Sequence, residues 1–143
     1  MADLLTRERR SWNMSRIRGK HTAPEMAVRS VLHKAGFRFR LHRKGFPGKP
    51  DIVLPKYKTV VFVHGCFWHR HQGCRNCTTP SNRRDWWLEK LNGNAARDKI
   101  NRRALQKLGW RVVVVWECQT EKKSGLQKLT HRLERVIRRR NGL

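Results

Sequence analysis

The run Trp110-Arg-Val-Val-Val-Val-Trp116 is the most apolar stretch of the chain, and it constrains the fold more than any other feature. A continuous apolar run rich in β-branched residues is typical of a strand buried on both faces. Two further apolar strands are predicted at 51–54 and 59–63, joined by the tight turn Pro55-Lys-Tyr-Lys58. Residues 37–41 alternate like a half-buried strand. Because 143 residues fit one hydrophobic core, these strands are expected in one small sheet.

Helical patterns flank the strands. The first helix is predicted to begin at the capping box Thr22-Ala-Pro-Glu25 and to end at Gly36. A second helix is predicted from Trp86 to Leu108, with an interruption near Asn92-Gly-Asn94, and a third over 126–139. The order α-β-β-β-α-β-α predicts an α/β fold in which a small mixed sheet is flanked by helices.

The charge of the chain points to its partner. Thirty-four Lys and Arg stand against 10 Asp and Glu, which gives a formal net charge of +24. Such a field gathers polyanions, so nucleic acid is the leading candidate. A membrane is a weaker candidate, because no stretch is long and apolar enough to enter a bilayer. A basic protein without catalysis, such as a ribosomal or packaging protein, fits the charge equally well.

The N-terminal segment carries alternating charges and few apolar side chains. We predict that residues 1–20 form a mobile arm or a loosely held helix that contacts DNA, and that residues 21–143 form one domain. Met1–Arg10 has no apolar segment after it, so no secretory signal is predicted and the cytosol is the expected compartment. Cysteines are kept reduced there, which favours metal ligands or buried thiols over disulfides.

An acidic residue lies at the start of a predicted strand. Asp51 follows a Gly/Pro loop, and the next strand ends at Val63-His64. Two strands joined by a tight turn would bring Asp51 close to that end. A carboxylate, a main-chain carbonyl, phosphate oxygens and water are ligands that magnesium prefers, so we predict a magnesium site there. The alternative is that Asp51 only caps the loop.

A cluster of zinc-ligand types follows: Cys66, His71, Cys74 and Cys77, with Cys118 directly after the apolar strand. Zinc in structural sites takes four such ligands in a tetrahedron. We favour Cys66, His71, Cys74 and Cys118, with Cys77 as the substitute, for instance for His71. Such a site would hold a long irregular loop against the central strand and would be structural. Unrelated buried thiols are the alternative.

Aromatic and imidazole side chains share this region. Phe67-Trp68 and Trp86-Trp87 are large aromatics in a polar, basic setting. They would either pack around the metal or wedge between base pairs, and the charge favours the wedge. His64 and His69 lie near both predicted metal sites, and a neutral imidazole can take a proton from water. Either is therefore a candidate general base.

The string Val61-Phe-Val-His-Gly-Cys-Phe-Trp-His69 resembles the signature of very-short-patch repair endonucleases, bacterial enzymes that nick DNA beside T:G mismatches. The resemblance covers roughly residues 10–138. Its further segments are Asn13-Met14, Thr22-Ala23 with Glu25, Pro47-Gly-Lys-Pro-Asp51, Trp87-Leu-Glu-Lys90, Asn94 with Arg97-Asp98, and Leu108-Gly-Trp-Arg-Val112 through Trp116-Glu-Cys118.

The resemblance implies a restriction-endonuclease-like fold and a set of catalytic residues, namely Asp51, His69, His64, Asp98 and Glu25. Asp51 would bind magnesium together with the main-chain carbonyl of Val63, and His69 would be the general base. His64 and Asp98 would hold metal-bound water or phosphate, and Glu25 would support the site. Many members have Thr where Val63 stands, but a carbonyl ligand survives that change.

The resemblance also implies the metal and DNA contacts. Zinc would lie on Cys66, His71, Cys74 and Cys118; the spacing from His71 to Cys74 and the extra Cys77 depart from the family pattern. The residues that would enter the duplex are Phe67, Trp68 and Trp87 from the major groove, and Met14 and Ile17 from the minor groove.

The leading hypothesis is a magnesium-dependent, strand-specific endonuclease that nicks 5′ to the T of a T:G mismatch. Double-stranded DNA is its expected partner, with mismatch-repair proteins as further partners, and we expect a monomer in the bacterial cytoplasm at the nucleoid. One alternative is a related nickase or restriction-like endonuclease with another site preference. The other is a zinc-stabilised DNA-binding module without catalysis.

Overall fold

The predicted strands form one four-stranded sheet in the order β1-β2-β3-β4. The computed structural model describes residues 22–139. The strands are β1 (Arg40–Leu41), β2 (Ile52–Leu54), β3 (Thr59–His64) and β4 (Arg111–Trp116). The pairs β1–β2 and β2–β3 are antiparallel, whereas β3 and β4 run parallel over six residue pairs, from Thr59↔Arg111 to His64↔Trp116. The predicted α/β fold with a small mixed sheet is confirmed.

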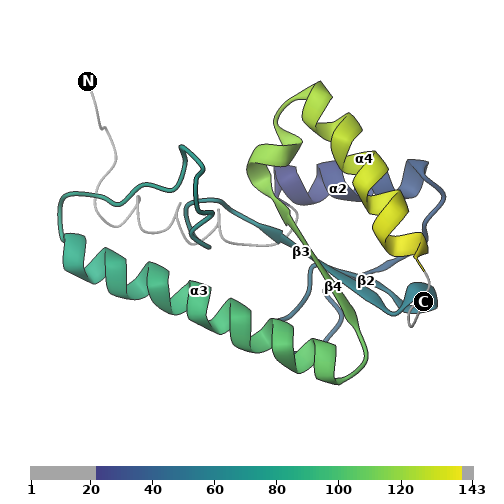
Figure 1. Cartoon of the computed structure of the whole chain (residues 1–143), viewed down its shortest axis with the longest axis horizontal. Coiled ribbons are helices and arrows are strands. Elements are labelled where there is room, and N and C mark those ends of the chain that lie inside the picture. Colours follow the sequence, from purple (N-terminus) through teal and green to yellow (C-terminus); the bar gives the residue numbers. More distant parts are fainter. Residues whose placement is uncertain (1–21, 140–143) are drawn as a thin grey trace.

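Within residues 22–139, three helices cover the sheet: α2 (Ala23–Lys34), α3 (Arg84–Lys107) and α4 (Lys123–Arg138), with short 3₁₀ turns at Pro55–Tyr57 and Glu117–Thr120. Helices α2 and α4 cover one face, while α3 lies against the other (Figure 1). The core on the α2–α4 side is the larger one, and its buried residues include Val28, Leu32, Val113, Leu133 and Ile137. On the α3 side, Leu105 packs with Val53, Val60, Phe62 and Val112.

Helix α3 runs without a break, so the predicted interruption at 92–94 is wrong. Asn is a poor helix former because its side chain competes for backbone hydrogen bonds, and Gly is one because it loses more backbone entropy on folding. The Asn94 side chain instead donates to the main-chain oxygen of Trp68, 3.1 Å away. Its amide is thus used by the neighbouring loop, and the helix continues through this position.

The predicted strand at 37–41 is too long, because only Arg40–Leu41 pairs in the sheet. The N–H of Phe37 donates to the carbonyl of Leu32 and closes α2, and its buried ring packs edge-on against Tyr57. The alternating apolar and basic residues of this segment therefore have two origins. Phe37 is a core residue that follows a helix, and only the end of the segment is a strand. The helix predicted over 126–139 begins earlier, at Lys123.

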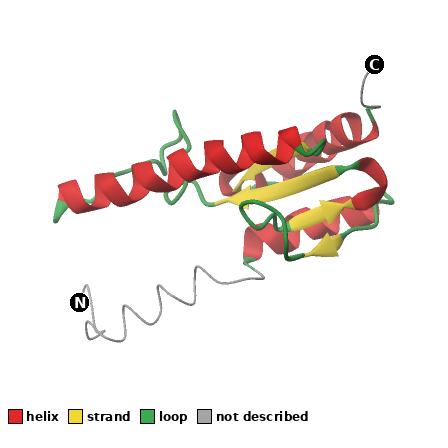
Figure 2. Ribbon diagram, turned by 90° about the horizontal axis from the view of Figure 1, so that it is seen from below, coloured by secondary structure: helices red, strands yellow, loops and turns green. Residues whose placement is uncertain are grey.

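The long loop after β3 and the N-terminal half of α3 extend together beyond the sheet (Figures 1 and 2). The parallel strands β3 and β4 both end at this edge, and ligands of open α/β sheets bind outside the carboxyl ends of parallel strands. No helix within residues 22–139 is long and apolar enough to cross a membrane. The predicted arm over residues 1–20, with Met14 and Ile17, lies outside the described residues.

Candidate active site

Asp51 lies against the end of β3, as the tight turn predicted. Its N–H donates to the carbonyl of Val61 at 3.1 Å, and its carboxylate accepts from the N–H of Val63 at 2.7 Å. The N–H and C=O of one strand residue point toward the same side of the strand. The carbonyl of Val63 is therefore directed to the edge where the Asp51 carboxylate lies. A carboxylate and a carbonyl oxygen so arranged are suitable ligands for a hard divalent cation.

A second group joins the post-β3 loop to α3. The Nδ1 atom of His69 lies 2.7 Å from Oδ2 of Asp98. An imidazole that donates from Nδ1 to a carboxylate keeps Nε2 as an acceptor, which is the arrangement a general base needs. The ring of His69 stacks on that of His64, with centroids 3.9 Å apart and planes at 4°. Asp98 thus contacts His69, and the role at metal-bound water or phosphate that the resemblance implied for it stays a prediction.

A third group surrounds Glu25, the buried acid of the first helix. Its carboxylate lies 3.2 Å from the guanidinium of Arg29, one turn later, and 3.4 Å from Nε2 of His42. Ligand atoms of Glu25, His42 and Asp51 all lie within 4.8 Å of one another. Glu25 is therefore brought to the Asp51 site, together with two residues that the sequence reading did not single out.

One open cleft of about 800 Å³ is lined by residues of all three groups. Its walls include Glu25, Asp51, Val63, His64, His69 and Asp98. Asp51 and His69 face the same space, so one phosphate can approach both. This condition is necessary for a carboxylate-bound cation and an imidazole base to act on one phosphodiester.

Burial changes the acid–base properties of two cleft residues. It raises the pKa of Asp51 from 3.8 to about 6; the Val63 N–H opposes this rise, and the neighbouring Glu25 carboxylate adds to it. Burial also lowers the pKa of His64 from 6.5 to about 4, helped by the adjacent His69. His64 is therefore neutral at pH 7, and its ring can stack on His69 without charge repulsion.

The raised pKa of Asp51 predicts a gain in stability when its charge is removed. The unfolded chain loses the Asp51 proton near pH 3.8, whereas the folded protein keeps it up to about pH 6. The free energy of unfolding therefore falls between these two pH values, and it stays lower by the full amount above them. Asp51→Asn should therefore stabilise the magnesium-free protein at pH 8 by up to about 3 kcal/mol. The gain should shrink steadily below pH 6. Urea unfolding of both proteins between pH 4.5 and 8 checks this, and a gain that does not depend on pH contradicts it.

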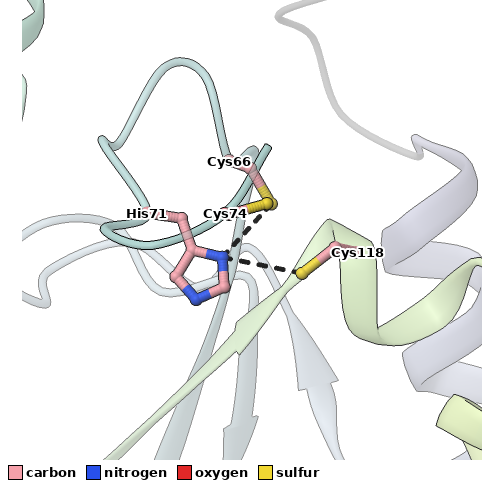
Figure 3. Close-up of side chains that lie close together, drawn as sticks. All are labelled: Cys66, His71, Cys74 and Cys118. Atoms are coloured by element: carbon pink, nitrogen blue, oxygen red, sulfur yellow. Dashed lines mark hydrogen bonds between the residues drawn. The ribbon is translucent and has the colours of Figure 1, made fainter. Parts of the chain in front are cut away.

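The predicted zinc ligands meet at one point (Figure 3). Cys66, His71 and Cys74 come from the loop, and Cys118 comes from the turn after β4; their ligand atoms lie within 4.8 Å of one another. Nδ1 of His71 is 3.5 Å from Sγ of Cys66 and 3.5 Å from Sγ of Cys118. Tetrahedral zinc with ordinary bond lengths separates nitrogen and sulfur ligands by about 3.6 Å. The four residues therefore fit zinc, and Cys77 lies outside this group.

Neighbouring residues hold these ligands in place. Glu117 accepts a hydrogen bond from the N–H of Cys66 at 2.9 Å, across 51 positions of sequence. The indole of Trp116 stacks on the ring of His71, with centroids 4.2 Å apart and planes at 6°. Burial raises the pKa of Cys66 to about 12 and raises that of Cys118, which would keep both protonated. Buried thiols become good ligands only when a cation displaces their protons.

We expect the purified protein to carry close to one zinc ion per chain, bound through Cys118. Cys118→Ala should lose most of this zinc and unfold at a temperature lower by several degrees, because the loop is no longer tied to β4. Cys77→Ala is the matched control and should keep its zinc. Elemental analysis and thermal unfolding provide the two readouts. Equal zinc loss in both variants would contradict the ligand assignment.

The aromatic residues of the loop form a cluster with Trp87, and two of them, Phe67 and Trp68, line the cleft. Phe67 packs edge-on against Trp68 at 5.0 Å, and Trp87 of α3 lies 5.6 Å from Phe67 and 5.9 Å from Trp68. All three are half-buried, whereas Trp86 is exposed and lies between Arg83 and Lys90. The three rings pack on one another and stay partly accessible, so whether they act as a wedge remains a prediction.

A basic α/β protein with acids and imidazoles gathered in one open cleft at its strand ends has the site of a nucleic-acid-cleaving enzyme. Residues 2–76 match the family described as DNA mismatch endonuclease Vsr. The chain is 42% identical to the DNA mismatch endonuclease Vsr of Escherichia coli (strain K12) over 139 residues, which cover 96% of this chain and 88% of that protein. This chain belongs to the Vsr family and is a DNA endonuclease.

Two other relatives are similar over almost their whole length. The type II nicking enzyme V.XorIIP of Xanthomonas oryzae pv. oryzae is 51% identical over 137 residues, 96% of this chain and 98% of that protein. The type II nicking enzyme V.NmeAIP of Neisseria meningitidis serogroup A is 46% identical over 138 residues, with the same coverage of both chains. The resemblance to mismatch-nicking endonucleases drawn from the sequence is confirmed.

Proposed function

We propose that this chain is a magnesium-dependent endonuclease that nicks one strand of double-stranded DNA 5′ to the T of a T:G mismatch, in very-short-patch repair. The observation that carries the proposal is the shared cleft. Its walls include the Asp51 carboxylate, which is hydrogen-bonded to the N–H of Val63, and the hydrogen-bonded pair of His69 and Asp98. Family membership supports cleavage of mismatched DNA.

Asp51 and the main-chain carbonyl of Val63 would hold the magnesium ion, since both offer oxygen to a hard cation. Bound there, magnesium would supply charge stabilisation to the phosphate and to the leaving oxygen. The remaining steps belong to the protein. Nε2 of His69 takes a proton from the attacking water, and Asp98 stabilises the imidazolium that results. Neutral His64 supports the ring of His69, and Glu25 would support the site from α2, beside Asp51.

Mismatch preference would come from the aromatic cluster. Phe67, Trp68 and Trp87 would enter the duplex from the major groove, with Met14 and Ile17 reaching in from the minor groove. Mismatched pairs unstack at lower cost than matched pairs, so an aromatic wedge favours them. The packing of the three rings against one another supports a single wedge that enters as a unit.

The same proposal includes the remaining features of the chain. The zinc on Cys66, His71, Cys74 and Cys118 would be structural, because four protein ligands leave no open position. The sheet with helices on both faces is consistent with a restriction-endonuclease-like fold. The protein would act as a monomer on nucleoid DNA in the bacterial cytoplasm, alongside other mismatch-repair proteins.

A nicking assay tests the proposal. Two duplexes that differ only in one T:G or T:A pair are labelled on the T strand and incubated with enzyme and magnesium. We expect the T:G duplex to be nicked at least roughly tenfold faster, from the difference in unstacking cost. The name type II nicking enzyme, which several relatives carry, favours a second candidate, a nickase with another site preference. Faster cutting of the matched duplex would support that candidate instead.

A further inference from the structure

Arg29 and His42 lie beside the candidate magnesium site, and the roles proposed above do not use them. The Arg29 guanidinium lies 3.2 Å from the Glu25 carboxylate and 3.2 Å from Nε2 of His42. The three side chains are 12%, 8% and 15% exposed, in the order Arg29, Glu25, His42. A cation is therefore held in a mostly buried position next to a cleft that is expected to bind another cation.

Two features of the fold bring this group together. Glu25 and Arg29 are one turn apart on α2 and so share a helix face. His42 follows β1, whose register pairs Leu41 with Ile52, so His42 lies opposite Asp51; its N–H donates to the Asp51 carbonyl at 3.2 Å. The helix face and the strand register thus converge on the two carboxylates of the site.

Charge is the physical reason for such an arrangement. Ligand atoms of the Glu25 and Asp51 carboxylates lie within 4.8 Å of each other, and the Arg29 guanidinium lies 3.2 Å from the Glu25 carboxylate. Two carboxylates without a counter-cation would attract a divalent ion strongly even without DNA, because attraction between buried charges is poorly screened. Arg29 offsets part of that charge.

We propose that Arg29, oriented by His42, is a positioning residue that serves as a built-in counter-cation of the magnesium site. It fixes the Glu25 carboxylate and weakens metal binding to the free protein, so that the phosphate oxygens of DNA are needed to complete the site. The inference rests on the proposed placement of magnesium at Asp51. It makes cation loading depend on the DNA substrate.

Direct metal binding tests the inference. Mn²⁺ alone is titrated into the zinc-containing protein without DNA, and electron paramagnetic resonance measures the free ion. Arg29→Met should bind Mn²⁺ roughly five- to tenfold more tightly than the parent, since one opposing charge is gone. Its single-turnover nicking rate at saturating magnesium should fall about tenfold, because Glu25 is no longer held. A variant that was merely misfolded would lose both properties.

Arg29→Lys separates charge from geometry. It should restore the weak Mn²⁺ binding of the parent while nicking stays slow, because an ammonium group cannot contact Glu25 and His42 through the same planar fork. Unchanged or weaker Mn²⁺ binding in a folded Arg29→Met protein, judged by circular dichroism and retained zinc, would overturn the inference. Asp51→Asn tests the proposed magnesium site separately from the role of Arg29. If this variant binds Mn²⁺ as the parent does, the assignment of magnesium to Asp51 is wrong.

Discussion

Asp51→Asn should lower the single-turnover nicking rate on a T:G duplex by roughly a thousandfold or more. A metal at a phosphodiester contributes several kcal/mol of transition-state stabilisation, and each 1.36 kcal/mol is about tenfold in rate. Asn keeps the shape of the side chain and can still accept the hydrogen bond from the N–H of Val63. The loss should therefore reflect the missing negative charge alone.

A control variant that loses the same charge elsewhere shows whether the effect is specific to Asp51. Glu121→Gln removes the same unit of charge from an exposed side chain that does not line the cleft, and it should nick at the parent rate. Binding of the uncut duplex by the Asp51 variant should be equal or tighter, because one carboxylate fewer faces the phosphates. A rate within about threefold of the parent would exclude Asp51 as the metal ligand.

The local part of the site could be predicted from the sequence. The β2–β3 turn is four residues long, so Asp51 had to lie near Val63, and the structure brings them into contact. The zinc ligands Cys66, His71 and Cys74 are close in sequence, and Cys118 follows the strand that pairs with β3. In each case a short connection or one parallel strand pair determines the geometry, so spacing is informative.

The nonlocal part could not be predicted. His42 lies opposite Asp51 because of the register of β1 on β2, which an irregular loop over 42–51 does not reveal. Arg29 reads as one more cation on a basic helix, and only its burial against Glu25 distinguishes it. Glu117 and Cys66 are 51 positions apart, and nothing in their spacing suggests a contact. Burial and strand register depend on tertiary contacts, and neither residue type nor spacing along the chain reveals them.

His69→Gln should lower the nicking rate by about a hundred- to ten-thousandfold, with little change in DNA binding. A positioned general base contributes a factor of this size, and a Gln amide cannot take a proton from water near pH 7. Asp98→Asn should also lose activity, since the carboxylate 2.7 Å from Nδ1 fixes the tautomer that leaves Nε2 free. His33→Gln, an exposed change on α2, is the control and should leave the rate unaltered.

The double variant decides whether these two residues act as a unit. If Asp98 works only through His69, the double variant should be no slower than His69→Gln alone, because side chains that act together show strongly non-additive losses. Fully multiplicative losses would mean that Asp98 has its own role at the phosphate or at metal-bound water. That role was implied by the resemblance, whereas the 2.7 Å contact favours the coupled one. Single-turnover rates of the four proteins, measured from pH 6 to 9, distinguish the two.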